Sequence, residues 1–249
     1  MTEFQAYCKV SISPVRREAG DQSEIVTQLL FGEVITVKEV NEPWAKIQTL
    51  SDGYEGSIDF KHFQKLSDKE VRRWMEGLSN LKDRERTLST PWGIQRICRG
   101  SFLPENTKAF TIGNDHFEFI DESTQEFTTP LEYAMDYLNT PYLWGGKTPF
   151  GIDCSGITQV IYRFFGINFP RDAFEQADIG TEIDFEDLEA GDLAYFDKNG
   201  KITHVGILDG EGGIIHAAGH VRLDRITPEG IVHSTSKILT HKLTCIKRN

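Results

Sequence analysis

The chain has 249 residues and a formal net charge of −11 at pH 7, which is enough sequence for one large domain or two small domains with a proper core. The negative charge argues against a non-specific binder of nucleic acid or of anionic membranes. No apolar run is long enough to span a bilayer, and the first residues lack the basic and apolar regions of a signal peptide. We therefore expect a cytoplasmic protein with no nucleic-acid partner and no membrane partner.

The four cysteines, Cys8, Cys98, Cys154 and Cys245, are scattered along the chain without a recognisable spacing. Such a distribution predicts no disulfide framework. The lack of a CxxC pair argues against a structural zinc site. We expect neither a metal ion nor a cofactor.

Residues 1–66 are expected to form a small all-β barrel. Residues 34–39 alternate in the way that is typical of a half-buried strand, and Ser51-Asp52-Gly53 is a hairpin-turn signal. Five short strands in this length indicate a small barrel. The runs rich in strand-forming residues lie at positions 6–12, 25–30, 33–40, 45–50 and 56–58.

Residues 67–128 are expected to form a linker subdomain, for which a reduced second barrel is an alternative. Residues 68–81 have a helical composition with one apolar face. A turn at residues 113–115 between aromatic residues predicts a hairpin, and residues 87–97 suit either a strand or an extended linker. No chemistry is visible in this segment.

Residues 129–249 are expected to form one larger domain with a cysteine at the start of a helix. Cys154 follows a glycine-rich loop, and after it apolar residues recur at Ile157, Val160, Ile161 and Phe164, which is one face of a helix. The unpaired N–H groups and the positive dipole end of a helix start favour the thiolate form of a cysteine. The alternative is a small buried core residue.

The second half of this domain predicts strands at residues 193–196, 201–208 and 214–218, the first two joined by a tight turn. A helix followed by such a sheet indicates an α+β domain, with the helix packed on an antiparallel sheet. The alternation in the middle strand places His204 and Leu208 on one face and Val205 and Ile207 on the other.

A nucleophilic cysteine needs a base and a group that orients this base. His204 and His216 lie in adjacent predicted strands and can be cross-strand neighbours, so we expect them to serve Cys154 in these roles. A satisfied core residue is the alternative for either histidine, and a zinc site of the same three residues is the less favoured chemistry. His220 is a weaker third member. Four histidines in polar or terminal contexts are expected at the surface: His62, His116, His233 and His241.

Several motifs resemble those of the NlpC/P60 family of cysteine peptidases. The matching segments are PYLWGGKTPFGIDCSG, FPRDAFEQ, LEAGDLAYF, HVGI and IIHAAG, between residues 141 and 218. Earlier in the chain, SEIVTQLLFGE, Trp44 and DGYEGSID resemble a bacterial SH3-type (SH3b) domain. Together they are similar to bacterial γ-D-glutamyl-L-diamino acid endopeptidases, which cut peptidoglycan stem peptides.

This resemblance implies an α+β, papain-like catalytic domain that follows a small SH3-like barrel. It implies that Cys154 is the nucleophile, His204 the base, His216 the orienting third member, and Tyr142 a donor at the oxyanion site. It also implies positions beside the substrate for Asp153, Ser155, Arg171 and Asp172 and, from the barrel, for Tyr54 and Glu24.

The function implied by the resemblance is hydrolysis of the γ-D-glutamyl bond to an L-diamino acid, either meso-diaminopimelate or lysine. The lack of an export signal favours free peptides from cell-wall recycling over intact wall. Glu24 and Asp172 are candidate partners for the ammonium group of an N-terminal L-Ala, because a buried ammonium needs paired carboxylates. An acyltransferase with the same Cys/His core and a protein that only binds cell-wall peptides are the alternatives.

Overall fold

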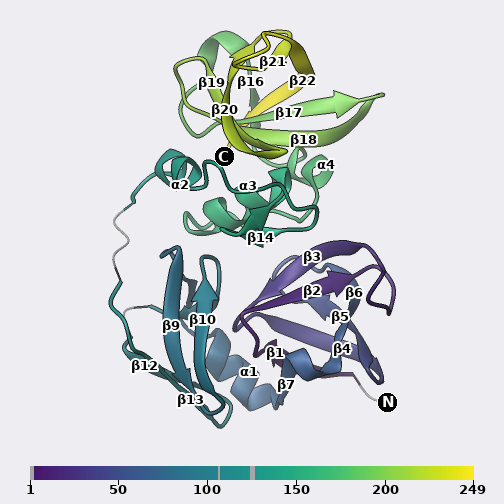
Figure 1. Cartoon of the computed structure of the whole chain (residues 1–249), viewed down its shortest axis with the longest axis vertical. Helices are drawn as coiled ribbons and strands as arrows, with labels where there is room; N and C mark the ends of the chain where they lie inside the picture. Colours follow the sequence, from purple (N-terminus) through teal and green to yellow (C-terminus); the bar gives the residue numbers. More distant parts are fainter. Residues whose placement is uncertain (1–2, 106, 124–126) are drawn as a thin grey trace. The chain divides into compact units, whose positions relative to one another are not determined.

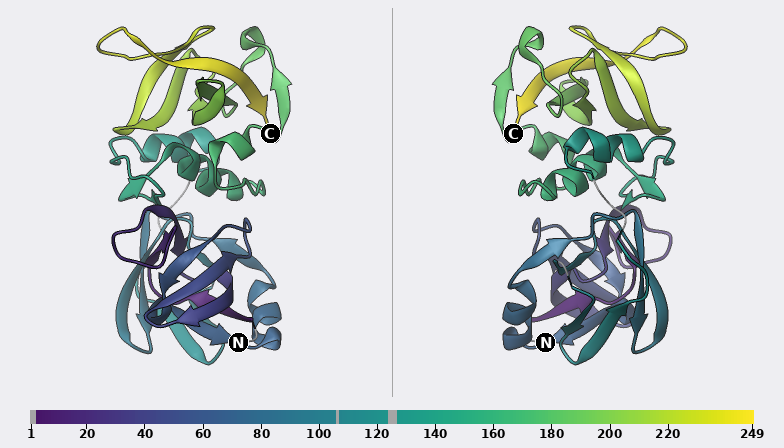
Figure 2. Two further views of the ribbon diagram at one scale, coloured as in Figure 1. Left: turned by 90° about the vertical axis from the view of Figure 1, so that its right-hand side faces the viewer. Right: turned by 90° about the vertical axis from the view of Figure 1, so that its left-hand side faces the viewer.

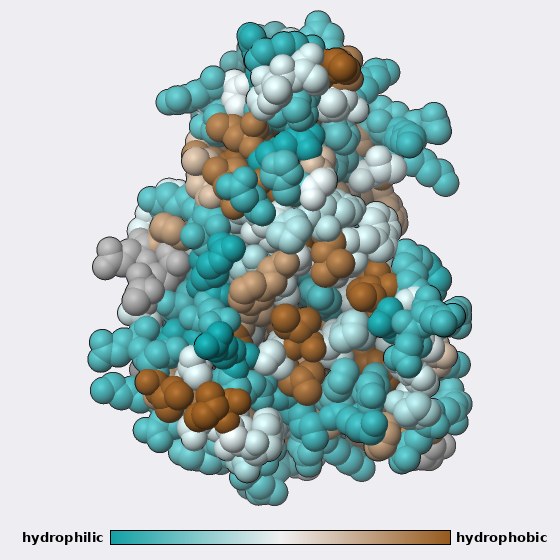
Figure 3. Space-filling model, viewed as in Figure 1, coloured by the Kyte–Doolittle hydropathy of each residue, from teal (hydrophilic) through white to brown (hydrophobic). Residues whose placement is uncertain are grey.

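The computed structural model describes residues 3–105, 107–123 and 127–249. The chain forms two compact units that divide between Gln125 and Glu126, and the elements of both are labelled in Figure 1. Most of the surface seen in Figure 3 is hydrophilic, in keeping with the net charge of −11. Among the described residues, no helix is both long and apolar enough to cross a membrane.

The first unit contains a seven-stranded antiparallel sheet in the order β3-β2-β6-β5-β4-β1-β7. The predicted single strand at residues 6–12 is wrong, because the chain bends at residues 9–11 and divides this run between two strands. The strands are β1 (Phe4–Cys8), β2 (Ile12–Arg16), β3 (Ile25–Leu30), β4 (Val34–Asn41), β5 (Trp44–Thr49), β6 (Glu55–Asp59) and β7 (Phe63–Leu66), with the 3-10 helix η1 (Phe60–His62) before β7.

Helix α1 (Asp68–Met75) opens the rest of this unit with a capping box between Ser67 and Glu70. The helix is shorter than the predicted 68–81, because Gly77 takes a positive φ of 68° and ends it. A four-stranded sheet in the order β10-β9-β13-β12 and the pair β11-β8 follow. Their strands are β8 (Leu78–Asn80), β9 (Glu85–Thr90), β10 (Gly93–Cys98), β11 (Phe102–Pro104), β12 (Ala109–Ile112) and β13 (Asp115–Phe119), of which β12 and β13 form the predicted hairpin.

The two parts of the first unit share one apolar core, in which Phe31 contacts Phe110 and Phe117. The indole Nε1 of Trp74 in α1 donates to the Gly32 carbonyl at 2.9 Å. Residues after α1 therefore complete their core with barrel residues, which explains why their own sequence pattern is weak. The predicted ranges 1–66, 67–128 and 129–249 remain a prediction, and positions 1–2, 106 and 124–126 within them lie outside the described residues.

The second unit combines short helices with a closed antiparallel barrel. Its seven-stranded sheet has the order β16-β22-β17-β18-β19-β20-β21, and pairing of β21 with β22 closes six of these strands into the barrel. The antiparallel sheet was predicted without this closure, because the last strands carry a weaker apolar pattern. The elements are α2 (Pro130–Asp136), β14 (Lys147–Thr148), β15 (Gly151–Ile152), α3 (Cys154–Arg163), α4 (Ala173–Gln176), β16 (Thr181–Ile183), η2 (Phe185–Asp187), β17 (Leu193–Lys198), β18 (Lys201–Leu208), β19 (Gly213–Ala218), β20 (His220–Thr227), β21 (Gly230–Val232) and β22 (Leu239–Arg248).

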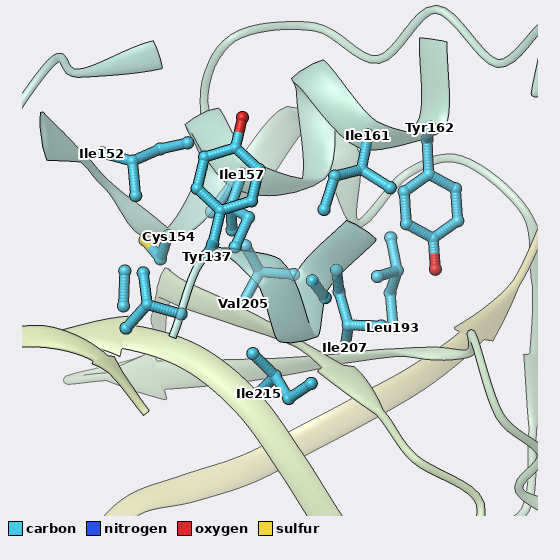
Figure 4. Close-up of a cluster of buried hydrophobic side chains, with 14 of the residues drawn as sticks. Tyr137, Ile152, Cys154, Ile157, Ile161, Tyr162, Leu193, Val205, Ile207 and Ile215 are labelled. Carbon is cyan, nitrogen blue, oxygen red and sulfur yellow. The ribbon is translucent and has the colours of Figure 1, made fainter. Parts of the chain in front are cut away.

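The helices of this unit gather on one side of the barrel (Figure 2). Val205 and Ile207 of β18 pack with Ile157 and Ile161 of α3 in one apolar cluster, drawn in Figure 4. Leu208 joins a second cluster with residues of β17, β19 and the closing strands. The predicted alternation of β18 between two faces is thus confirmed, and it decides which side chains reach the barrel interior.

Candidate active site

Helix α3 begins at Cys154, as predicted, and Asp153 caps it. The Asp153 Oδ1 accepts a hydrogen bond from the Gly156 N–H at 2.7 Å, and its Oδ2 accepts one from the Gly145 N–H at 2.8 Å. A Cβ atom at Gly156 would lie 2.2 Å from the Gly146 carbonyl oxygen, so only glycine permits this approach. The glycine-rich loop is therefore packed directly against the first turn of the cysteine helix.

A buried ion pair supports this cap. Arg171, only 1% exposed, donates from Nη2 to Asp153 Oδ2 at 2.5 Å and from Nη1 to Ser155 Oγ at 2.8 Å. These three residues, expected beside the substrate, thus form one network under Cys154. Asp172 follows at the N-cap position of α4, where it makes no side-chain capping bond.

The Cys154 thiol lies against the backbone on both sides of His204. Its Sγ donates to the Thr203 carbonyl at 4.0 Å. Burial, followed by the charge of Asp153, raises the pKa of this thiol to about 12, although the backbone N–H groups of Val205 and Ser155 and the charge of Arg171 act in the opposite direction. The expected preference of the helix start for a thiolate is therefore wrong for the resting protein, because desolvation outweighs the helix-end donors.

The predicted histidine pair is formed. His204 Nε2 and His216 Nδ1 are 2.9 Å apart, across the paired strands β18 and β19. Burial, and then the neighbouring His216, lower the pKa of His204 well below its ordinary value. The side chain is thus a neutral imidazole at pH 7, which is the form that accepts a proton. Its Nδ1 is the ring nitrogen that the hydrogen bond to His216 does not use.

Asp224, which was not predicted as a site residue, contacts the second histidine of this pair. Asp224 Oδ2 lies 3.1 Å from His216 Nε2 and accepts a 2.8 Å hydrogen bond from Arg222 Nε. Asp224 is only 2% exposed. The sequence did offer one sign of this carboxylate: an acidic residue lies among the apolar residues of positions 220–227, in the strand that follows that of His216.

His241 corrects a second expectation. Predicted at the surface, it lies in β22 with its ring stacked on that of His204, at 4.3 Å between centroids and 21° between planes. Closure of the barrel by β22 brings it there, and this closure was not visible in the sequence. The ring of Phe196 contacts the His204 ring as well, with 5.9 Å between centroids. His204 is therefore held between aromatic neighbours.

Tyr142 packs against the cluster that contains Cys154. Burial, followed by the nearby Cys154 and Asp153, raises the pKa of its hydroxyl above the ordinary value. The hydroxyl consequently keeps its proton at neutral pH and is able to donate a hydrogen bond. This is the property that an oxyanion donor needs.

Tyr54 and Glu24 lie in the first unit. Glu24 forms an ion pair with Arg17, with 2.7 Å between Oε2 and Nε, and Tyr54 packs against the barrel core. In the part of the chain that the structure describes, no group of three or more His, Cys, Asp or Glu residues is arranged to hold a metal ion.

A cysteine at a helix start beside a hydrogen-bonded histidine pair is the arrangement of a thiol peptidase. In agreement, the profile of the NlpC/P60 family matches residues 139–240, and that of the bacterial dipeptidyl-peptidase Sh3 domain matches residues 15–59. A Bacillus subtilis (strain 168) protein named gamma-D-glutamyl-L-lysine dipeptidyl-peptidase is 43% identical over 220 residues, which cover 78% of this chain and 72% of the relative.

A protein of the same name from Bacillus cereus (strain ATCC 10987 / NRS 248) is 28% identical over 240 residues, which cover 83% of this chain and 71% of the relative. The crystal structure of an NlpC/P60 family protein from Bacillus cereus ATCC 10987 has a TM-score of 0.77 at 21% identity, covering 98% of this chain and 99% of that one. The chain therefore belongs to the NlpC/P60 family of cysteine peptidases, with an SH3-like domain at its N-terminal side, as the motifs predicted.

Proposed function

We propose that this chain is a cysteine endopeptidase that hydrolyses the γ-D-glutamyl bond to an L-diamino acid in peptidoglycan stem peptides. The observation that carries the proposal is the hydrogen-bonded pair His204–His216 beside Cys154 at the start of α3. The name of the relatives with which it shares 43% and 28% identity supports this substrate class. A papain-like arrangement, with the nucleophile on a helix packed against the sheet that carries the base, is part of the same proposal.

The proposed reaction begins with both partners neutral. The Cys154 sulfur attacks the γ-carbonyl carbon while its proton passes to His204 Nδ1. The oxyanion of the tetrahedral intermediate accepts hydrogen bonds from the Cys154 N–H at the helix start and from the Tyr142 hydroxyl. His204 then protonates the leaving amine of the diamino acid, and the bond to it breaks.

Hydrolysis of the thioester follows the same path in reverse. His204 takes a proton from a water molecule, whose oxygen attacks the acyl carbon. The bond from this carbon to sulfur then breaks, the sulfur takes the proton back from His204, and the γ-glutamyl product leaves. His216 orients the base throughout. Asp153, Ser155 and Arg171 are proposed to serve substrate binding by holding the start of α3 beneath the substrate.

We further propose the domain division 1–66, 67–128 and 129–249, in which the barrel supplies part of the specificity. Asp172 of the second unit is proposed to bind the free amine of an N-terminal L-Ala, and Glu24 and Tyr54 of the first unit are proposed substrate-binding residues. The name of the two relatives, dipeptidyl-peptidase, supports this, because an enzyme of that kind releases a dipeptide from a free amino terminus. The natural substrates are then released peptides in cell-wall recycling in the cytoplasm.

The test compares L-Ala-γ-D-Glu-L-Lys with its N-acetylated form by mass spectrometry of the products. The free tripeptide should be cut between D-Glu and L-Lys, and acetylation should lower kcat/KM by about tenfold or more, because the acetylated peptide has no ammonium group to pair with a carboxylate. Asp172→Asn and Tyr54→Phe should narrow this difference. Asp178→Asn, at an exposed residue just after α4, is the matched control and should not narrow it. Equal kcat/KM for both peptides in the unsubstituted protein rules out the amine site.

A further inference from the structure

The carboxylate of Asp224 is held in its ionised state by the hydrogen-bond donors around it. Arg222 Nε donates to its Oδ2 at 2.8 Å, and the Ser234 N–H donates to its Oδ1 at 2.7 Å. Burial alone would raise the pKa of Asp224, but these donors and His216 outweigh it and hold the pKa well below its usual range. An ionised carboxylate only accepts hydrogen bonds, so the proton between Asp224 and His216 belongs to the histidine.

The ionised carboxylate of Asp224 determines which nitrogen carries the proton in both His216 and His204. Because His216 Nε2 carries a proton for Asp224 Oδ2, at 3.1 Å, the neutral His216 ring has a bare Nδ1. That Nδ1 lies 2.9 Å from His204 Nε2, so His204 must donate from Nε2. The neutral His204 ring then has a bare Nδ1, which is the nitrogen needed to take the proton of Cys154.

We propose that Asp224 is a positioning residue that fixes the tautomer of the catalytic base His204 through His216. The site is therefore a chain of four side chains, Cys154, His204, His216 and Asp224, in which the last is two rings away from the nucleophile. The assignment extends the proposed peptidase mechanism and rests on it only for the kinetic part of the test. Without the carboxylate, His216 can donate from Nδ1, and the opposite tautomer of His204 turns an N–H toward the thiol and cannot act as its base.

The geometry around Asp224 makes Asn an informative replacement. An amide oxygen has to face the Ser234 N–H, because this backbone donor cannot move. The amide nitrogen then faces His216, and Arg222, whose side chain is 19% exposed, can turn to water. Asp224→Asn should therefore donate to His216 Nε2 and reverse the tautomers of both histidines.

Asp192→Asn is the matched control, because Asp192 is another buried carboxylate of the same unit with an arginine and a backbone donor. It accepts hydrogen bonds from Arg248 Nε at 2.9 Å and from the Glu189 N–H at 2.7 Å, and it contacts no histidine in the part of the chain that the structure describes. Loss of a buried ion pair is thus common to both variants. Only Asp224→Asn changes the partner of His216.

The deciding measurement is nitrogen-15 NMR of histidine-labelled protein near pH 7, with His204 and His216 assigned by single His→Gln replacements. We expect Nε2–H on both rings in the unsubstituted protein and in Asp192→Asn, and Nδ1–H on both in Asp224→Asn. A bare Nε2 on His204 in the unsubstituted protein overturns the proposal even if Asp224→Asn fails to fold. Unchanged tautomers in a folded Asp224→Asn overturn it as well.

Kinetics give a second readout. Asp224→Asn should lower kcat about 100-fold with KM little changed, as other outer-shell partners of a catalytic histidine do, and it should slow iodoacetamide alkylation of Cys154, followed by mass spectrometry. Asp192→Asn should leave both rates near the unsubstituted values. If no stem peptide is cut even by the unsubstituted protein, the peptidase proposal fails, while NMR and alkylation still decide the tautomer. Unchanged kcat and alkylation in a folded Asp224→Asn contradict the role of Asp224.

Discussion

Two buried carboxylates support the candidate site from opposite sides. Asp153, on the side of α3, pairs with the fully buried Arg171 and caps the helix of the nucleophile. Asp224, on the side of the barrel, pairs with the partly exposed Arg222 and contacts the histidine chain. The first lies beside the thiol and raises its pKa. The second lies two rings away from the thiol and acts through the histidines. An ion pair of similar kind therefore positions the helix start on one side and fixes which histidine nitrogens carry protons on the other.

Removing the nucleophile should have the largest effect on activity, since the carboxylates on both sides support Cys154. Cys154→Ala should lose all measurable hydrolysis of L-Ala-γ-D-Glu-L-Lys, because the nucleophile is gone, and it should keep its fold, because only one buried sulfur atom is removed. Cys245→Ala, at a half-buried cysteine of β22, is the control and should retain activity. Hydrolysis by Cys154→Ala at the unsubstituted rate contradicts the mechanism.

Breaking the ion pair on each side shows how much each pair contributes to the free energy of unfolding. Arg171→Met leaves the Asp153 carboxylate buried without its cation and should lower the free energy of unfolding by about 3–5 kcal/mol. Arg222→Met should cost about 1 kcal/mol or less, because Arg222 is partly exposed and Ser234 and His216 still contact Asp224. Denaturant unfolding of both variants checks the order. Equal losses would contradict the contrast between the two sides.

Acid should weaken the barrel side through His216. Burial lowers the pKa of His216 from 6.5 to about 4, so the unfolded chain binds this proton at a higher pH than the folded chain. The resulting stability is fully present above pH 6.5 and is lost as the pH falls toward 4, by about 3 kcal/mol in total. Denaturant unfolding near the two limits should show a smaller loss for His216→Gln. An identical loss would show that His216 does not titrate in this way.

Replacing His241, whose ring stacks on His204 on the barrel side, should have the smallest effect on activity. His241→Phe keeps a ring on His204 and should keep most of the activity. His241→Ala removes the stacking, about 0.5–1.5 kcal/mol for such a pair, and should lower kcat by about three- to tenfold with KM unchanged. Steady-state kinetics of both variants decide this. The same kcat for Ala and Phe would assign no role to the ring.

The α3 side was largely predictable, because its residues are contiguous. The loop, Asp153, Cys154 and the apolar face at residues 157–161 occur in one stretch, and periodicity together with the family motifs places them correctly. The strands that carry His204 and His216 were also predicted, since their apolar alternation is strong. The thiol pKa was not, because desolvation depends on how deeply the whole helix start is buried.

The barrel side was predictable only in part. Asp224 and His241 reach the histidine pair because β20 and β22 take part in a closed barrel, and such long-range pairing leaves little trace in the local pattern. In the first unit, residues 67–128 share a core with the barrel, so their own pattern was incomplete. The sequence thus indicated the groups that we propose to react, and tertiary pairing added the groups that contact them.

The most direct test is to trap the acyl-enzyme. The protein is mixed with L-Ala-γ-D-Glu-L-Lys, quenched in acid within the first turnover and analysed by peptide mass spectrometry. We expect a thioester of L-Ala-γ-D-Glu on the peptide that contains Cys154, absent in Cys154→Ala and accompanied by free L-Lys. An adduct on Cys8, Cys98 or Cys245 instead, or release of L-Lys by the Cys154→Ala protein, would contradict the proposed mechanism.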